Sequence, residues 1–481
     1  MNKEKTIGWN FDNSYSNLPK SFIYEISPVP VKRPELVIFN HDLADQMGLN
    51  FSNVDNEQLA KMFSGNLLPK GSKSLAQAYA GHQFGHFTML GDGRAVLLGE
   101  HISKSNQRLD IQFKGSGQTP FSRNGDGRAA LGPMLREYLI SEAMYSLNIP
   151  TTRSLAVVKT GENVIREKPL QGAILTRVAS SHIRVGTFQF IRTRENLDEL
   201  NTLVNYTIKR HYPEISKSKN NAYDLLSKLI DKQIELVVNW MRVGFIHGVM
   251  NTDNMAISGE TIDYGPCAFM DSYNLGTCFS SIDHMGRYAY GNQPAITKWN
   301  LARFAECLLT LINPKKDDAL KMATELIDKF DKIYEEKWFN MMKSKLGLIG
   351  DDKVDNLIIF ELLEIMKKQE LDYTNTILFL MDHEIDDKKS FQNEEFDNWK
   401  IKWLKRLTKD SKNLMELNNP VIIPRNHNVE SVLKSAENND LTPFNDLLQA
   451  LKNPYTNQKV LTKYQSPPPK SDEKYQTFCG T

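Results

Sequence analysis

Residues 247–266, HGVMNTDNMAISGETIDYGP, decide which fold we expect for this chain. They follow an amphipathic run over 225–241 that predicts a helix, and they indicate a loop, a short strand, a turn and a second short strand. Asn254 and Asp263 lie at the two ends of this predicted hairpin. Both carry hard oxygen donors, and a hairpin can bring its ends together on one Mg²⁺ ion. The segment therefore predicts a site for a divalent cation.

The order of these polar residues is that of a protein-kinase catalytic loop. His247 stands seven residues before Asn254, and an Asp-x-Gly follows at Asp263. Kinases carry a base aspartate two residues after the histidine, and Val249 occupies that position here. Asp253 is the only carboxylate left within reach, so we expect it to accept a proton. The alternative interpretation is a polar loop that ends in a turn.

A glycine pair, a lysine and a glutamate form a second group. Gly91 and Gly93 stand between two predicted strands, where glycines let backbone N–H groups approach a phosphate. Lys114 ends a predicted strand, and Glu137 lies on the predicted helix that follows. A strand lysine held by a helix glutamate positions nucleotide phosphates in kinase folds. The alternative is a loop with two solvated charges, because a glycine pair is a weak signal.

Strand patterns dominate the chain after an irregular lead, and helical patterns dominate the second half. We expect an α+β, protein-kinase-like two-lobed fold, with a β-rich N-lobe, a helical C-lobe and an extension at each end. Its parts are an N-terminal extension over 1–75, an N-lobe over 76–190, a C-lobe with the catalytic loop over 191–410, and a C-terminal extension and tail over 411–481. The strands are predicted over 95–100, 109–114, 154–159 and 172–177, and the longer helices over 225–241, 299–312, 318–345, 354–369 and 393–407.

Composition excludes several classes of protein. Lysine and arginine number 59 and aspartate and glutamate 58, so the formal net charge is +1. A balance this even argues against a polybasic protein that binds nucleic acid or a membrane surface. No window approaches the ~18 apolar residues of a transmembrane helix, and the first residues lack the apolar region of a secretory signal. The four cysteines lack CxxC spacing, so neither a disulfide framework nor a zinc site is expected. We therefore expect a cytoplasmic protein.

Several long stretches carry a resemblance to a known family. They are GHQFGHFTMLGDGRA over 81–95, DIQFKGSGQTPFSRNGDGRAALGPMLREYLISEAM over 110–144, LTRVASSHIRVGTFQ over 175–189, GFIHGVMNTDNMAISGETIDYGP over 244–266, and the terminal Cys479. With these, the chain resembles the selenoprotein O family of protein adenylyltransferases, which have a pseudokinase-like fold. Cys479 stands where family members carry selenocysteine, so selenium chemistry is absent here.

The resemblance implies that ATP binds in a flipped orientation. AMP would then pass to Ser, Thr or Tyr hydroxyls of proteins, with Mg²⁺ or Mn²⁺ required and pyrophosphate released. Asn254 and Asp263 would hold the metal, and Asp253 would be the proton acceptor. The predicted nucleotide site comprises Gly91, Gly93, Arg94, Lys114, Asp126, Gly127, Arg177 and Arg184, with Glu137 as the partner of Lys114.

Three of these residues also have a physical reason to bind a nucleotide. Arg177 and Arg184 lie at a strand end and in a loop, and guanidinium groups bind phosphate bidentately without losing charge. Asp126 precedes a helix N-terminus, a place that favours anions. A carboxylate there suits a ribose, an adenine amino group or a metal better than a phosphate. Taken alone, the two arginines could equally be surface residues.

Two other functions compete with adenylyl transfer. One is a protein kinase that transfers the γ-phosphoryl group, and Val249 argues against it. The other is a nucleotide-binding pseudokinase scaffold, which would not need the metal ligands Asn254 and Asp263.

The cysteines suggest a redox switch. Cys278 lies where a kinase fold places its activation segment, and Cys479 lies on a polar, proline-rich tail. An accessible thiol oxidises readily, so we expect the two to form a reversible disulfide under oxidative stress. The alternative is two unrelated free thiols.

Overall fold

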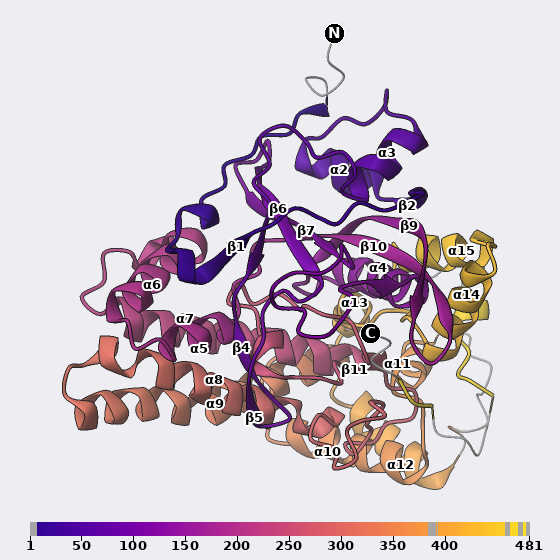
Figure 1. Ribbon diagram of the computed structural model, residues 1–481. Helices are drawn as coiled ribbons and strands as arrows, with labels where there is room; N and C mark the ends of the chain where they lie inside the picture. Colours follow the sequence, from indigo (N-terminus) through magenta and orange to yellow (C-terminus); the bar gives the residue numbers. More distant parts are fainter. Residues whose placement is uncertain (1–6, 383–390, 392, 457–461, 470–474, 478–481) are drawn as a thin grey trace.

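The computed structural model describes residues 7–382, 391, 393–456, 462–469 and 475–477. The chain is of mixed α and β structure. The strands of the main sheet lie before residue 180, and most helices follow residue 184. Figure 1 shows α2 and α3 at the top of the view, the sheet below them, and most of the helices after residue 184 below and beside the sheet. The expected α+β class is confirmed.

Eight strands of the described residues form the main sheet, in the order β1-β3-β6-β7-β10-β9-β2, with β8 paired to β10. Every pair is antiparallel. The strands are β1 (Ile23–Glu25), β2 (Glu35–Phe39), β3 (Leu75–Gln77), β6 (Ala95–Ile102), β7 (Arg108–Lys114), β8 (Ala129–Ala130), β9 (Arg153–Ile165) and β10 (Pro169–Ala179). The four predicted strands are present. The lead was expected to be irregular, but β1 and β2 form the two edges of the sheet, where short strands near prolines are tolerated.

The helices of the described residues include the five longer predicted ones, over 225–241, 299–312, 318–345, 354–369 and 393–407, with shifted ends. They are α2 (His41–Met47), α3 (Asn56–Phe63), α4 (Leu131–Ser146), α5 (Val185–Arg192), α6 (Leu197–His211), α7 (Asn221–Val243), α8 (Gln293–Ile312), α9 (Lys316–Lys345), α10 (Asp355–Lys368), α11 (Tyr373–Leu380), α12 (Glu394–Leu404), α13 (Ser411–Asn418), α14 (Asn426–Glu437), α15 (Thr442–Leu451) and α16 (Thr462–Gln465). The long helix α7 shows why the ends lie where they do. The Asn220 side chain accepts the Tyr223 N–H at its start, and Gly244, at φ 72°, ends it in a left-handed conformation.

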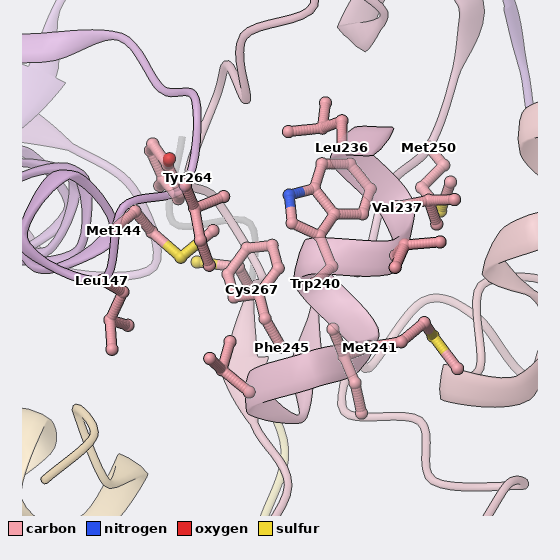
Figure 2. Close-up of a cluster of buried hydrophobic side chains, with 14 of the residues drawn as sticks. Met144, Leu147, Leu236, Val237, Trp240, Met241, Phe245, Met250, Tyr264 and Cys267 are labelled. Carbon is pink, nitrogen blue, oxygen red and sulfur yellow. The ribbon is translucent and has the colours of Figure 1, made fainter. Parts of the chain in front are cut away.

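A buried apolar cluster joins the sheet to the helices (Figure 2). The Phe245 ring lies 5.6 Å from the Trp240 ring on α7 and 6.1 Å from the Tyr264 ring, and Met144 on α4 belongs to the same cluster. The Trp240 indole N–H donates to Thr261 Oγ1 at 2.9 Å. Packing of this kind holds the polar 247–266 segment between the two halves of the molecule.

The prediction that two short strands between Asn254 and Asp263 pair with each other as a hairpin is wrong. Ala256 forms a bridge to Arg184, and Thr261 forms a bridge to Thr151, so the two short segments pair with other parts of the chain. The strands that do pair lie outside the loop: β11 (Phe245–Ile246) is antiparallel to β12 (Ala268–Phe269). The backbone groups of these two segments form hydrogen bonds with distant parts of the chain and not with each other across a local turn.

None of the helices in the described part of the chain combines the length and the apolar character that a membrane crossing requires.

Candidate active site

A cavity of about 970 Å³ lies between the sheet and the polar 247–266 segment. All twelve predicted site residues line it: Gly91, Gly93, Arg94, Lys114, Asp126, Gly127, Glu137, Arg177, Arg184, Asp253, Asn254 and Asp263. They come from the loop before β6, from β7, β10 and α4, from the loop before β8, from the N-cap of α5, and from the segment after β11. Residues up to 172 positions apart in the sequence therefore share one cavity.

Two cations and two carboxylates alternate on one wall of the cavity. Lys114 Nζ lies 2.6 Å from both Glu137 Oε2 and Asp263 Oδ1. Arg177 Nη2 lies 2.6 Å from both Glu137 Oε1 and Asp263 Oδ1. Burial opposes the ionisation of Glu137, but Arg177 and Lys114 hold the pKa of its carboxyl below the usual value. Each buried charge is thus compensated, and Asp263 joins the 247–266 segment to the sheet.

Asp263 is ionised and held in a demanding backbone conformation. Burial raises its pKa, but Lys114, Arg177 and Arg184 together hold the pKa well below 3.8. Its φ is 65°, a left-handed conformation that costs free energy for a residue other than glycine. A strained, ionised carboxylate at a cavity wall is typical of a functional position.

Arg184 differs from Arg177 in its partners. It is fully buried at the start of α5, where Nε donates to the His182 carbonyl at 3.1 Å and Nη1 donates to the Asp253 carbonyl at 3.2 Å. Its guanidinium carbon lies 4.3 Å from the centre of the Tyr79 ring. Within the described residues it forms no salt bridge with a carboxylate, whereas Arg177 forms two. A buried guanidinium that faces a cavity and has no carboxylate in direct contact favours an anionic ligand.

Asp253 and Asn254 belong to a short 3₁₀ turn, Thr252–Asn254, and both line the cavity. Asp253 is buried, and its Oδ1 has no hydrogen-bond partner in the described part of the chain. Burial raises the pKa of this carboxyl to about 6, although Arg184 acts in the opposite direction. Asn254 Nδ2 donates to the Val249 carbonyl at 3.0 Å, which orients the amide and leaves its oxygen as an acceptor.

The glycine loop is shaped by a neighbouring loop. Gly91 has φ 125°, and a Cβ there would lie 2.4 Å from the Phe121 ring. A Cβ at Gly93 would lie 2.8 Å from the Phe121 carbonyl oxygen. The same neighbouring loop carries Asp126, whose carboxylate pairs with Arg166 Nη1 at 2.9 Å. A hydrogen bond from Arg166 holds the pKa of Asp126 below 3.8. The glycines are therefore needed for loop packing as well as for any approach to a phosphate.

Sequence reasoning missed several residues that line the cavity. Asp92 stands between the two glycines, accepts the Gln77 N–H at 3.0 Å and has a pKa raised to about 6 by burial. Arg166 reaches the cavity from the turn between β9 and β10, in a charged REK sequence that could have drawn attention. Glu430 and Lys434 on α14 also line the cavity, and no local signal in the sequence pointed to them.

Three residues of the C-terminal tail lie against the segment that contains Cys278. The Thr477 N–H donates to the Phe279 carbonyl at 2.7 Å, and the Ser281 N–H donates to the Thr477 carbonyl at 3.0 Å. Cys278 is a free, half-buried thiol whose pKa is raised to about 11 by burial and by the Asp283 carboxylate. Cys479 lies outside the described residues.

Metal-binding groups are sparse in the described part of the chain. No cluster there brings together three or more His, Cys, Asp or Glu side chains suited to a metal ion. Asn254 and Asp263 offer two oxygen donors at the cavity. Mg²⁺ is commonly held by one or two carboxylates with water and substrate phosphates as the other ligands, so a two-residue set suits it.

Comparison with known proteins identifies close relatives. A family model described as "Protein adenylyltransferase SelO" matches residues 5–452, which include all twelve predicted site residues. A protein named protein nucleotidyltransferase YdiU from Pelagibacter ubique is 64% identical over 482 residues, covering 99% of this chain and 100% of that protein. Proteins of the same name from Nitrosococcus oceani and Bacillus thuringiensis are 54% and 55% identical, and the matches cover 100% of this chain and 99% and 100% of those proteins.

Proposed function

This chain belongs to the SelO family of protein adenylyltransferases, and on that basis we propose that its cavity binds ATP and transfers AMP to hydroxyl side chains of proteins. Arg184 carries this proposal: it is a buried cation that faces the cavity and has no carboxylate partner among the described residues. The triphosphate supplies the missing counter-charge. The acceptor is a Ser, Thr or Tyr hydroxyl.

The reaction is a single displacement at the α-phosphorus. The hydroxyl oxygen of the protein substrate forms a bond to that phosphorus, and the bond to the β-phosphate bridging oxygen breaks, so pyrophosphate leaves. Asp253 takes the hydroxyl proton, and a pKa near 6 suits a base that must be ionised at neutral pH and still accept a proton. Arg184 and the Lys114–Arg177 pair offset the charge that develops on the departing pyrophosphate.

Asn254 and Asp263 would hold the Mg²⁺ or Mn²⁺ that this chemistry needs. Their hard oxygen donors, and the ionised state of Asp263, fit such an ion. A bound divalent cation would offset the negative charge of the phosphates. Asp263 now shares its Oδ1 between Lys114 and Arg177, which keeps the carboxylate turned toward the cavity wall.

The nucleotide lies reversed relative to a kinase substrate. Val249 stands where a kinase carries its base aspartate. Asp253 stands four residues later, next to the proposed metal ligand Asn254. Phe121 also packs against the glycine loop, while Arg184 offers a second position for an anion in the cavity. These features favour transfer from the α-phosphate over transfer from the γ-phosphate.

The architecture we propose is the kinase-like, two-lobed one, with the boundaries set at 75, 190 and 410. Its support is the ion pair between a strand lysine, Lys114 on β7, and a helix glutamate, Glu137 on α4, across from an Asp-x-Gly at Asp263. We place the protein in the cytoplasm, where its four cysteines would be reduced at rest.

A disulfide between Cys278 and Cys479 would regulate this activity. Support comes from Thr477, two residues before Cys479, which is hydrogen-bonded to the residues next to Cys278. The raised pKa of Cys278 makes its thiolate scarce at neutral pH, so the bond would form slowly and only under oxidising conditions.

Labelled ATP tests the proposal directly. The pure protein, Mg²⁺ and a protein mixture are incubated with ATP labelled at either the α- or the γ-phosphate. We expect the α label to enter protein and the γ label to leave in pyrophosphate. Protein labelled from the γ position alone would establish a kinase, and binding of ATP with no label from either position would establish a scaffold.

A further inference from the structure

A β-hairpin outside the main sheet is fixed to the loop that carries Asp253. Its strands are β4 (Ala80–Gln83) and β5 (His86–Met89), and Figure 1 shows it extending away from the sheet toward α8. The His82 N–H donates to Thr252 Oγ1 at 2.7 Å, and the Phe84 N–H donates to Asn251 Oδ1 at 3.1 Å. A Cβ at Gly81 would lie 2.3 Å from Asp253 Oδ1, so the hairpin backbone packs directly on this carboxylate.

The hairpin also contacts the segment over 275–290 and the helix α8. The rings of Phe84 and Tyr288 lie 5.1 Å apart, and the His82 ring lies 5.2 Å from both Phe87 and Trp299. The hairpin, this segment and α8 therefore adjoin one another, and we give the name hairpin face to six of their side chains: Phe87, Met89, Ile282, Met285, Arg287 and Trp299.

The hairpin face contains four large apolar side chains that are exposed to solvent. Phe87 is 45% exposed, Met89 49%, Ile282 51% and Met285 92%. Four large exposed apolar side chains on adjoining segments are typical of an interaction surface, whereas isolated ones are common anywhere. The hairpin face therefore has the character of a docking site for another polypeptide.

The charge of the hairpin face indicates which polypeptide fits. The Arg287 guanidinium carbon lies 4.9 Å from the centre of the Trp299 ring, and within the described residues Arg287 has no salt bridge and its buried Nε has no hydrogen-bond partner. The only acidic residue over 275–290 is Asp283, which is buried and accepts the N–H groups of Arg287 and Tyr288. An incoming carboxylate would complete this site.

We propose that the hairpin face docks the protein substrate and selects segments in which a carboxylate and an apolar side chain lie near the acceptor hydroxyl. This inference rests on the proposed function, the transfer of AMP to a hydroxyl of a protein substrate. Docking there orients the hydroxyl because the hairpin is hydrogen-bonded to the two residues that precede Asp253.

Short synthetic peptides test the inference. Each has a single threonine and a leucine, and the set differs only in carrying glutamates or lysines. Peptide binding is measured by fluorescence anisotropy, and transfer is measured with α-labelled ATP. We expect the acidic peptide to bind more tightly and to have the lower KM. Phe87→Asp and Met285→Asp should each raise that KM about tenfold, as expected for loss of a buried interface anchor, while the KM for ATP stays unchanged.

Charge reversal gives a result that misfolding cannot imitate. Arg287→Glu should weaken the acidic peptide and favour the basic one. Leu417→Asp and Ile401→Asp are the controls, because these residues are 68% and 54% exposed on α13 and α12, outside the hairpin face. They should behave as the wild type.

The outcomes separate the two ideas. Peptide binding with the expected charge preference but no label from α-labelled ATP would leave docking standing and overturn adenylyl transfer. Transfer that is indifferent to peptide charge and to Phe87→Asp would overturn docking and leave transfer standing. Concentration-dependent dimers of the wild type that Phe87→Asp abolishes, with no effect of the peptides, would show that a second copy occupies the face and would also overturn docking.

Discussion

Replacement of Asp253 by asparagine removes a buried negative charge while keeping the size of the side chain. In the wild type the carboxylate is 8% exposed, and Oδ1 lacks a hydrogen-bond partner among the described residues. If Asp253 accepts the proton of the acceptor hydroxyl, Asp253→Asn should slow transfer by about 10²–10⁴-fold, the usual contribution of a general base. Binding of ATP should change little, because the hydrogen bond from Arg184 goes to the backbone carbonyl of Asp253.

The pH dependence of transfer follows from the same carboxyl. Burial raises the pKa of Asp253 to about 6, so the base is protonated at lower pH. The wild-type rate should fall about tenfold for each pH unit below this value, as expected for one essential deprotonated group. The Asp253→Asn variant should lack that fall, because asparagine does not titrate.

The stability of the fold should change in the opposite sense to activity. The pKa of Asp253 is higher in the folded state, at about 6, than the 3.8 of an unperturbed aspartate, so the folded state binds the proton more tightly. The resulting stabilisation is complete below pH 3.8 and is lost as the pH rises through 6. At 1.36 kcal/mol per pKa unit, the ionised carboxylate costs about 3 kcal/mol at pH 8. Asp253→Asn should therefore raise the free energy of unfolding by up to about 3 kcal/mol at pH 8 and by nearly nothing at pH 4.

Steady-state transfer from α-labelled ATP across pH 5–8 and urea unfolding at pH 4 and 8 check both effects. The matched control is Asp92→Asn, because Asp92 is equally buried and its pKa is also raised to about 6. Asp92→Asn should alter the stability profile but keep the fall in transfer rate below pH 6. If the fall instead persists in Asp253→Asn and disappears in Asp92→Asn, Asp253 is not the proton acceptor.

Four further substitutions test the rest of the site. Asp263→Ala should lower transfer by more than about 10³-fold with Mg²⁺ present, measured with α-labelled ATP, because a charged metal ligand is lost; activity within tenfold of the wild type would contradict the metal assignment. Glu137→Gln should lower the free energy of unfolding, measured in urea, by about 3 kcal/mol and should also weaken ATP binding, because two buried cations lose their partner. The control is Glu142→Gln on the same helix, which breaks an ion pair outside the cavity and should affect stability only. Arg184→Met should raise the Kd for ATP about tenfold or more in calorimetry, and it should also lower the free energy of unfolding by about 1–3 kcal/mol because two buried backbone carbonyls lose their donor; unchanged affinity would refute the anion position. Cys278→Ser should abolish any response of transfer to oxidants and to dithiothreitol, and a response that survives would exclude the disulfide.

Much of the fold was predictable because its signals are local. The strands over 109–114 and 172–177 and the helix over 225–241 have apolar periodicities that hold wherever the rest of the chain lies. Pairing was not predictable in the same way. The strands β7 and β10 are neighbours, with Arg177 opposite Gln112, although 65 residues separate them. The hairpin that we expected after Asn254 failed for the same reason, because distant segments offered its backbone groups better partners.

The sequence by itself determined which side chains could meet at the site. The glycine pair, Lys114, Glu137, Asn254 and Asp263 are recognisable because their chemistry requires those residue types in that order. Only the tertiary structure decided what each one does there. It gave Arg177 two carboxylate partners and Arg184 none, although the sequence presents the two arginines alike. It also buried Asp253 and so raised its pKa to about 6. Ion pairing and desolvation depend on neighbours through space and on exclusion of water, which arise only when the chain is folded.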